Sequence, residues 1–401
     1  MIIVGGTYDE ICFEPRWEEK LGSGLRACRA INKVNPRQDI QFYTFGNDNT
    51  KLYLNQVQSV FQKIRSEVIP IDKSITFYYD HPLITPRIFP RLDTVDKSNN
   101  YIKVTGDDIL YFGLIEGNAS VKGKRVVYDP QSPSNPLLFS QTQSSAEKLA
   151  IVVNLGEARK MTETHDLDKI KSFFLLKENV DVLVIKMGAK GALVIDRLSE
   201  EETLIPVYKT PLVWPIGSGD VFASIFAYYW FEGMTSKDAA KQASFLAAQY
   251  CTTKNFDFYA DMNLEPLMIK HYPQGKVYLA GPFFTYAERW LIDQIRSALI
   301  GIGLSVFSPW HDIGHGIASD VVIKDLAGLE ESKLVFAVID GLDSGTLFEV
   351  GYAVKKNIPV IAYVENETKE SIKMLEGTGC ILEKDLTTAI YKSFWLLSEN
   401  E

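Results

Sequence analysis

The stretch DGLDSGTLFEVGYA at residues 340–353 decides how the second half of the chain folds. The apolar run KLVFAVI before it predicts a buried strand, and the pattern after it predicts a helix that opens near Thr346. The unpaired N–H groups of a helix start carry partial positive charge, so a carboxylate in the first turn, Glu349, is expected to be ionised and able to act as a nucleophile. The alternative is that Glu349 only complements the helix dipole and that Asp343 caps the helix.

Short β-branched runs alternate with helical patterns on both sides of this stretch, which predicts two α/β domains. Residues 276–401 form a small doubly wound, flavodoxin- or Rossmann-like domain, in which ligands bind beyond the carboxyl ends of the strands. Residues 1–261 form a larger domain with a mainly parallel sheet. Between them, the sequence MNLEPLMIKHYPQG at residues 262–275 loses the pattern and is interpreted as a linker.

The composition limits the possible partners of the chain. A net charge of −9 argues against binding to a nucleic acid polymer, and no apolar run is long enough to span a membrane. The four cysteines are far apart and show neither disulfide nor metal-site spacing. We therefore expect a cytoplasmic protein that acts on small molecules and holds no metal through cysteine or histidine clusters.

The sequence WPIGSGDVFA, beginning at Trp214, precedes an apolar helix in the first domain. Gly217, Ser218 and Gly219 would let successive N–H groups converge on a phosphate at the helix start. Asp220 could then take a proton from the attacking hydroxyl. A glycine pair of this kind is often only a tight turn.

This loop resembles the Gly-Ala-Gly-Asp signature of ribokinase-like (PfkB) sugar and nucleoside kinases. The opening VGGTYD up to Asp9, the sequence NLGE from Asn154 to Glu157, and the turn at Gly188 resemble other elements of that family in the same order. The resemblance implies a ribokinase-like parallel-sheet fold, with ATP and Mg²⁺ as cofactors. It assigns Asp220 as the base and Gly217, Ser218 and Gly219 as the phosphate loop, with Asp9 on the acceptor sugar, Asn154 and Glu157 near magnesium and phosphates, and Gly188 near the nucleotide.

Three departures from the PfkB pattern concern the acceptor pocket. Trp214, Pro215 and Ile216 replace the acid and threonines before the loop, and Arg26 stands where a sugar-binding asparagine is expected. The segment between Asp9 and Gly22 is too short for the usual β-sheet lid. The alternative is therefore a kinase fold that no longer transfers phosphate.

The second domain offers a nucleoside site at its first strand. The sequence VYLAGPFF contains Tyr278 and ends in a turn with Gly281, Phe283 and Phe284. A small residue lets a ligand approach the backbone, and aromatic faces suit a stacked base. Phe283 and Phe284 could equally belong to the core. Asp325 follows on a predicted helix.

Together these segments resemble nucleoside 2-deoxyribosyltransferases, whose pattern is Y-x-A/G-G-P-x-F, a helical Asp, and D-x-G-x-x-x-E-x-G-Y-A. The resemblance implies that Glu349 attacks the anomeric carbon and that Tyr278 orients it. Asp325 would contact and help protonate the base, and Asp343 would hold a sugar hydroxyl. No cofactor is implied for this domain.

The implied chemistry is a double displacement through a glycosyl ester, with retention of configuration. Related hydrolases of deoxynucleoside monophosphates carry serine where this chain has Asp343, so an uncharged nucleoside is favoured, although Ser344 lies next to it. No residue decides whether a base or a water reaches the ester. Three hypotheses follow: a bifunctional salvage enzyme, a glycosidase or transferase with a non-catalytic kinase-like scaffold, and a non-enzymatic nucleoside sensor. Relatives of both halves associate, so a homo-oligomer is expected.

Overall fold

The computed structural model describes residues 1–95, 97, 100–132 and 135–399, and these form two compact units. The first comprises residues 1–210 and 214–268, and the second comprises residues 211–213 and 269–401. The division falls inside the segment expected to be a linker. That segment also contains β15 (Pro266–Leu267), which pairs antiparallel with β14 (Val207–Tyr208) in the first unit.

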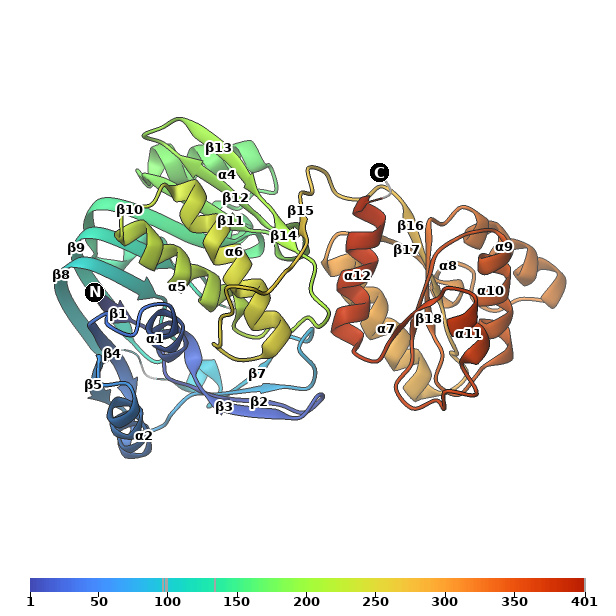
Figure 1. The fold of residues 1–401 in the computed structure, drawn as a ribbon, viewed down its shortest axis with the longest axis horizontal. Helices are drawn as coiled ribbons and strands as arrows, with labels where there is room; N and C mark the ends of the chain where they lie inside the picture. Colours follow the sequence, from blue (N-terminus) through green and yellow to red (C-terminus); the bar gives the residue numbers. More distant parts are fainter. Residues whose placement is uncertain (96, 98–99, 133–134, 400–401) are drawn as a thin grey trace. The chain divides into compact units, whose positions relative to one another are not determined.

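A nine-stranded sheet forms the centre of the first unit (Figure 1). It is parallel from β11 through to β5, and at the other edge β12 pairs antiparallel with both β11 and β13. The strands, in spatial order, are β13 (Glu201–Ile205), β12 (Ala192–Asp196), β11 (Val182–Lys186), β10 (Ser145–Asn154), β9 (Asn118–Asp129), β8 (Tyr101–Phe112), β1 (Ile2–Val4), β4 (Ile40–Gly46) and β5 (Ile64–Pro70). The expectation of a largely parallel α/β domain is confirmed.

Helices cover both faces of this sheet, so its central strands are apolar on both sides. On β10, Val152 packs into the core under α1, α5 and α6, whereas Val153 packs into the opposite core beside α3 and α4. This alternation follows from the two-residue period of a strand. The helices are α1 (Gly22–Val34), α2 (Asp48–Val60), α3 (Leu155–Thr162), α4 (Leu167–Ser172), α5 (Ser218–Phe231) and α6 (Ser236–Thr253).

A second, four-stranded sheet was not expected. It combines β2 (Asp9–Cys12) and β3 (Trp17–Lys20) with β6 (Thr76–Tyr79) and β7 (Arg87–Phe89). The prediction that the segment after Asp9 is too short for a β-sheet lid was therefore wrong, because the missing strands come from a later part of the chain.

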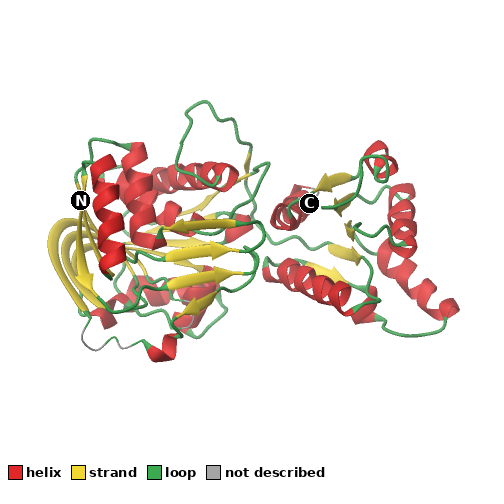
Figure 2. Cartoon of the chain, turned by 90° about the horizontal axis from the view of Figure 1, so that it is seen from below, coloured by secondary structure: helices red, strands yellow, loops and turns green. Residues whose placement is uncertain are grey.

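The second unit is a five-stranded, fully parallel sheet between helices (Figures 1 and 2). Its strands, in spatial order, are β17 (Ser305–Phe307), β16 (Lys276–Ala280), β18 (Leu334–Val338), β19 (Val360–Tyr363) and β20 (Ile381–Glu383). Its helices are α7 (Tyr286–Gly301), α8 (Pro309–Asp312), α9 (Ala318–Glu330), α10 (Ser344–Lys355), α11 (Lys373–Gly377) and α12 (Leu386–Glu399). The predicted small doubly wound domain is confirmed.

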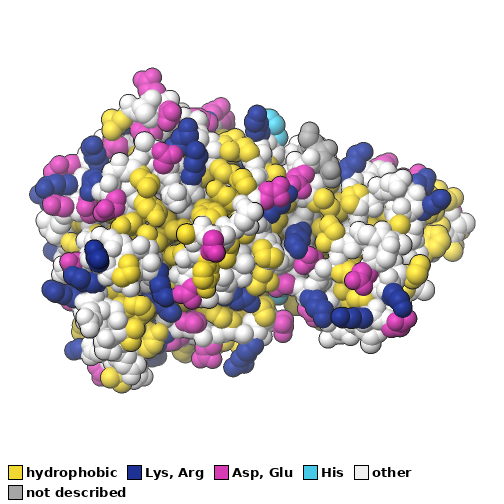
Figure 3. All heavy atoms as spheres, viewed as in Figure 1, with side chains coloured by type: hydrophobic (Ala, Val, Ile, Leu, Met, Phe, Trp, Pro, Cys, Tyr) yellow, Lys and Arg dark blue, Asp and Glu magenta, His cyan; other side chains and the backbone are white. Residues whose placement is uncertain are grey.

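The surface carries both signs of charge. On the face shown in Figure 3, acidic and basic side chains are interspersed, without one large basic area. Among the described helices, none combines the length and the apolar character needed to cross a bilayer.

Candidate active sites

Glu349 lies opposite Tyr278 at the centre of the second unit. Tyr278 belongs to β16 and is fully buried, and its Oη donates a hydrogen bond of 2.6 Å to Oε1 of Glu349 on α10. The two residues are 71 positions apart in the chain. The pairing of β16 with β18 puts them next to each other, because α10 follows β18 directly.

The expectation that the helix start keeps Glu349 fully ionised is wrong. Burial raises its pKa to about 7, the charges of Asp325 and Asp343 act in the same direction, and the Tyr278 hydrogen bond opposes them. Helix α10 begins at Ser344, so Glu349 is in its second turn and not beside the unpaired N–H groups of the first. At neutral pH this carboxyl group is therefore close to half protonated.

Asp343 caps helix α10. Its Oδ2 accepts hydrogen bonds from the backbone N of Thr346 at 2.8 Å and from the Thr346 hydroxyl at 2.9 Å. Asp343 therefore does act as the helix cap, which was the alternative to a role in substrate binding. Contact with a sugar hydroxyl stays a prediction.

Asp325 is half-buried on α9. Burial raises its pKa, and its Oδ1 is a buried atom that has no hydrogen-bond partner among the described residues. A buried carboxyl oxygen without a partner costs free energy, so it indicates a place where a ligand completes the hydrogen bonding. The charge of Asp325 acts on both Glu349 and Tyr278, and it raises both their pKa values.

Aromatic side chains follow β16 and β17. Phe283 stacks on Phe284 with ring centroids 5.4 Å apart and lies 5.7 Å from Trp310. Phe284 is 69% exposed, which argues against the alternative that both rings belong to the core. Gly281 has a packing reason of its own: a Cβ there would lie 2.7 Å from Ile292 Cδ1, so close approach by a ligand is not needed to explain this glycine.

Asp220 in the first unit is bound to a buried arginine. Arg26 on α1 is 1% exposed and donates from Nη1 to Asp220 Oδ2 at 2.6 Å, while its Nη2 donates to Glu10. Gln131 donates from Nε2 to the other oxygen of Asp220. Both oxygens of the expected base therefore already accept a hydrogen bond from the chain.

The loop before α5 does not form an open phosphate cradle. Gly217 has φ of +77°, as a tight turn requires, but Ser218 N donates to Pro215 O and Asp220 N donates to Gly217 O. Arg26 fills the space beside the turn, because a Cβ on Gly217 would lie 2.1 Å from its Nε. Gly219 lies on the same helix start. As they stand, these groups do not fit the triphosphate that the PfkB resemblance implies.

Asn154 and Glu157, the residues expected near magnesium, lie at the start of α3, and Asp129, which was not among the expected site residues, ends the neighbouring strand β9. Asn154 and Glu157 form a reciprocal capping box at the start of α3, with hydrogen bonds of 2.8 and 3.0 Å. Burial raises the pKa of Glu157, and it raises the pKa of Asp129 to about 7. Asp129 Oδ2 lies 2.5 Å from Lys186 Nζ. Within the described residues, no group of three or more acidic, histidine or cysteine side chains is arranged to hold a metal ion.

A cavity of about 370 Å³ contains Asp220, Arg26, Asn154 and Glu157, but Asp9 does not line it. Asp9 points the other way and pairs with Lys20 at 2.5 Å. Its neighbour Glu10, which the sequence interpretation missed, is the acid that reaches the cavity.

The turn at Gly188 joins the antiparallel strands β11 and β12, and its φ of +56° suits glycine. Lys186 and Gln131 were also not identified from the sequence as site residues. A lysine at the end of a buried strand was the available signal for Lys186. No local pattern marks Gln131.

The chain matches two protein families over separate segments. Residues 277–385 match the model of the family "Nucleoside 2-deoxyribosyltransferase", and residues 115–259 match that of the "pfkB family carbohydrate kinase". The two resemblances are confirmed. Both families are enzymatic, and their fusion in one chain indicates nucleoside metabolism. The PfkB match implies use of ATP and a divalent metal at the level of that family.

Solved structures similar to the chain are ribokinase-family kinases. A fructokinase from Vibrio cholerae O395 is 15% identical, with 64% of this chain and 94% of that one covered and a TM-score of 0.46. A nucleoside kinase from Burkholderia thailandensis is 16% identical, with coverage of 65% and 93% and a TM-score of 0.46. A ribokinase from Giardia lamblia is 13% identical, with coverage of 64% and 94% and a TM-score of 0.48.

The raised pKa of Glu349 predicts a pH-dependent gain in stability on substitution. Its folded-state pKa lies above its ordinary value of 4.5, so the folded protein is favoured at low pH and loses this stability as pH rises through about 7. Glu349→Gln should therefore raise the melting temperature at pH 8, by an amount that shrinks as pH falls to 5. Differential scanning calorimetry measures the melting temperatures of the two proteins at pH 8 and at pH 5. The exposed control Glu376→Gln should show no such trend, and an equal shift at both pH values would contradict the assignment.

The buried ion pair predicts that Arg26→Met is strongly destabilising. It leaves Glu10 and Asp220 without their cation, which costs about 3–5 kcal/mol when one partner of a buried pair is removed. Urea denaturation at neutral pH measures the loss, and Arg26→Met with Asp220→Asn should recover part of it. Arg16→Met, at an exposed arginine, serves as the matched control. A change below about 0.5 kcal/mol, the range of ordinary surface substitutions, would show that the network does not stabilise the fold.

Proposed function

We propose that the second unit breaks or exchanges the N-glycosidic bond of an uncharged (2′-deoxy)nucleoside through a glycosyl ester on Glu349. The observation that carries this proposal is the hydrogen bond of 2.6 Å between Tyr278 Oη and Glu349 Oε1. It holds one carboxyl oxygen and leaves the other for attack on the sugar.

In the first step, an oxygen of ionised Glu349 bonds to the anomeric carbon while the bond from that carbon to the base nitrogen breaks. The electron pair of the broken bond goes to the leaving nitrogen, which takes a proton. We infer that Asp325 donates it, because burial raises its pKa and favours the protonated form. General acid catalysis of this kind contributes roughly 10²–10⁴-fold.

In the second step, the nitrogen of another base, or a water, attacks the anomeric carbon from the face that the first base left. The ester bond breaks and its electron pair returns to Glu349. Two inversions give net retention of configuration. The base or the water loses one proton, which restores the protonated acid.

The charges of the site support an uncharged substrate. Glu349, Asp325 and Asp343 are close enough for the last two to raise the pKa of the first. A 5′-phosphate brought among three carboxyl groups would be repelled. The Asp343 side chain, where related monophosphate hydrolases carry serine, supports the same choice.

For the first unit we infer a non-catalytic, ligand-binding role, and ATP-dependent phosphorylation is the second candidate. The Arg26 contact with Asp220 at 2.6 Å supports the first, because a cation bound to the carboxylate stabilises its ionised form and makes it a weaker base. The family match alone supports the second. The cytoplasmic location and the homo-oligomer stay predictions.

The Glu349 proposal predicts loss of turnover on substitution. Wild-type protein incubated with a 2′-deoxynucleoside, with and without a second free base, should yield exchanged nucleoside or free base by chromatography. Glu349→Ala should lower the rate roughly 10³-fold or more, since a covalent nucleophile has no substitute, and Glu376→Gln should not. The rate for wild type should rise with pH through about 7, as Glu349 ionises.

A glycosyl adduct on the peptide that contains Glu349, trapped by acid quench and identified by mass spectrometry, would support the ester. Turnover that survives in Glu349→Ala would exclude it.

The inference for the first unit predicts no ADP release. Wild-type protein with ATP and magnesium should give background rates with a panel of sugars and nucleosides, and Asp220→Asn should behave the same. The exposed Asp261→Asn is the matched control. ADP release by the wild type that disappears in Asp220→Asn, but not in the control, would instead establish a kinase.

A further inference from the structure

Strands β8 and β9 have an unusual connection. They are adjacent and parallel over 12 residues each, from the pair Tyr101 and Asn118 to the pair Phe112 and Asp129. Parallel neighbours normally need a crossover of a dozen or more residues, usually a helix, but only residues 113–117 join these two. The strands themselves are curved instead, as the ribbons of Figure 1 show, and Gly106 and Gly123 form a pair about midway along them.

The bend brings the two ends of each strand around one cavity of about 640 Å³. Tyr101 and Tyr111 line it from the two ends of β8, and Ala119 and Tyr128 line it from the two ends of β9. The hydroxyl of Tyr111 donates to Ala119 O at 3.1 Å, which joins the end of β8 to the start of β9. A crossover helix would ordinarily cover this face of a parallel sheet. Because residues 113–117 form no helix, the face keeps an open cavity that a ligand can enter.

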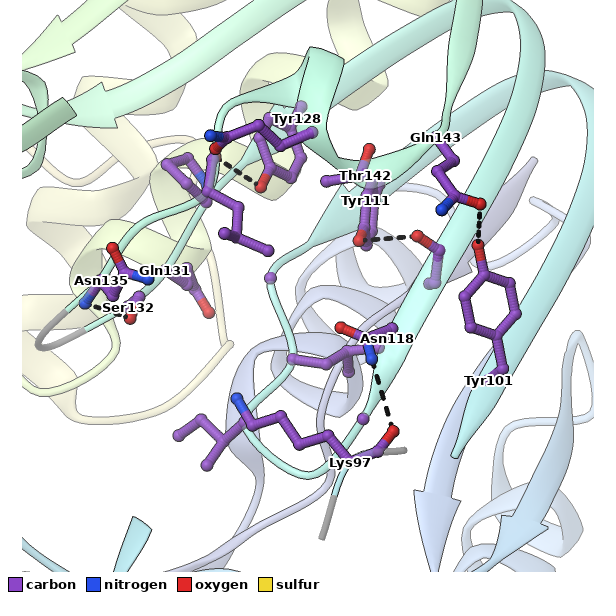
Figure 4. A pocket seen from close by; sticks show the side chains of 18 of the residues that line it. Lys97, Tyr101, Tyr111, Asn118, Tyr128, Gln131, Ser132, Asn135, Thr142 and Gln143 are labelled. Atoms are coloured by element: carbon purple, nitrogen blue, oxygen red, sulfur yellow. Dashed lines mark hydrogen bonds between the residues drawn. The ribbon is translucent and has the colours of Figure 1, made fainter. Parts of the chain in front are cut away.

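The cavity offers ring faces and amide groups (Figure 4). Tyr111 and Tyr128 lie 4.9 Å apart, and Tyr128 donates its hydroxyl to Leu137 O at 2.9 Å, so both hydroxyls are already used by the chain. Among the described lining residues, Asp93 and Lys97 are the charged side chains, one of each sign.

Five side-chain amides line the same cavity. They belong to Asn118, Gln131, Asn135, Gln141 and Gln143, and each amide has both donor and acceptor atoms. Asn118, Gln141 and Gln143 are exposed to solvent as well as to the cavity, so a ligand can reach them from outside.

We propose that this cavity binds an uncharged nucleobase or nucleoside. Tyr111 and Tyr128 are almost fully buried, so the partly exposed ring of Tyr101 is the one that a planar heterocycle can stack on. The edge donors and acceptors of such a heterocycle can pair with the amide atoms that the chain does not already use, because Asn118 and Gln141 each use one amide atom in a hydrogen bond to the backbone. The volume is in the range of small-molecule sites. A phosphate would find a single lysine beside an aspartate, which makes a nucleotide a poorer fit. The site goes beyond the proposed function, because it is in the first unit and uses none of the residues around Glu349.

The cavity also adjoins the one that contains Asp220. The two share Gly113, Ile115, Gln131 and Ser132 as lining residues. Gln131 links the two cavities, because it lines both of them and its Nε2 donates a hydrogen bond to Asp220. Its backbone φ of +37° is in the left-handed region that non-glycine residues seldom adopt. A base that takes the amide of Gln131 would release one oxygen of Asp220.

Hydrogen–deuterium exchange tests the site with millimolar adenine and, separately, thymine on the full-length chain. Either free base should slow exchange at residues 113–119 and 141–145. Asn118→Trp fills the exposed mouth of the cavity and Gln143→Leu removes an amide, so each should weaken the affinity roughly tenfold or more, as measured by titration calorimetry. Asn55→Trp, on the exposed face of α2, is the matched control and should leave both readouts unchanged.

Unchanged exchange at these two segments with both bases would overturn the proposal, as would affinities in Asn118→Trp and Gln143→Leu that stay within twofold of the control. Protection at residues 277–349 alone would place the binding in the second unit and also reject the site. Failure of the glycosidic chemistry is measured separately, as absence of turnover, and does not affect this result.

Discussion

The second unit depends on a carboxyl group that is buried among other carboxyl groups. Glu349 has Tyr278 as its hydrogen-bond donor, and no cation is among the groups that shift its pKa. Burial and like charges then keep it near the midpoint of its titration at neutral pH, which is unfavourable for folding. The nucleophilic role that we propose for Glu349 uses the ionised form and returns to it when the ester breaks. The parallel pairing of β16 and β18 supplies the rigid contact on which this arrangement rests.

In the first unit, by contrast, the central acid Asp220 has a cation next to it. Asp220 stands at the start of a helix after a glycine turn, and a fully buried guanidinium binds it and Glu10 together. This cation compensates both carboxylates, and Asp220 still lines the cavity. The two units thus differ in the neighbours of their central acids: Glu349 has like charges beside it, whereas Asp220 has a cation.

Much of the architecture follows from local pattern. The apolar runs of β1, β10, β11 and β18 are buried on both faces, and such strands are readable because every position is constrained. The polar strands β2, β3 and β7 were not predicted, since partly exposed strands carry little apolar signal and become strands only by pairing. The first halves of β8 and β9, in which buried and exposed residues also alternate, were missed for the same reason.

The sequence by itself determined the two α/β units and the order of their motifs, because these depend on residue type and spacing. Only the tertiary structure decided which of two adjacent acids enters the first cavity: β2 alternates faces, so Glu10 points inward and Asp9 outward. It also decided the ionisation of Glu349 and the cation beside Asp220. Charge and burial depend on neighbours that are distant in the chain, and no local pattern records those neighbours.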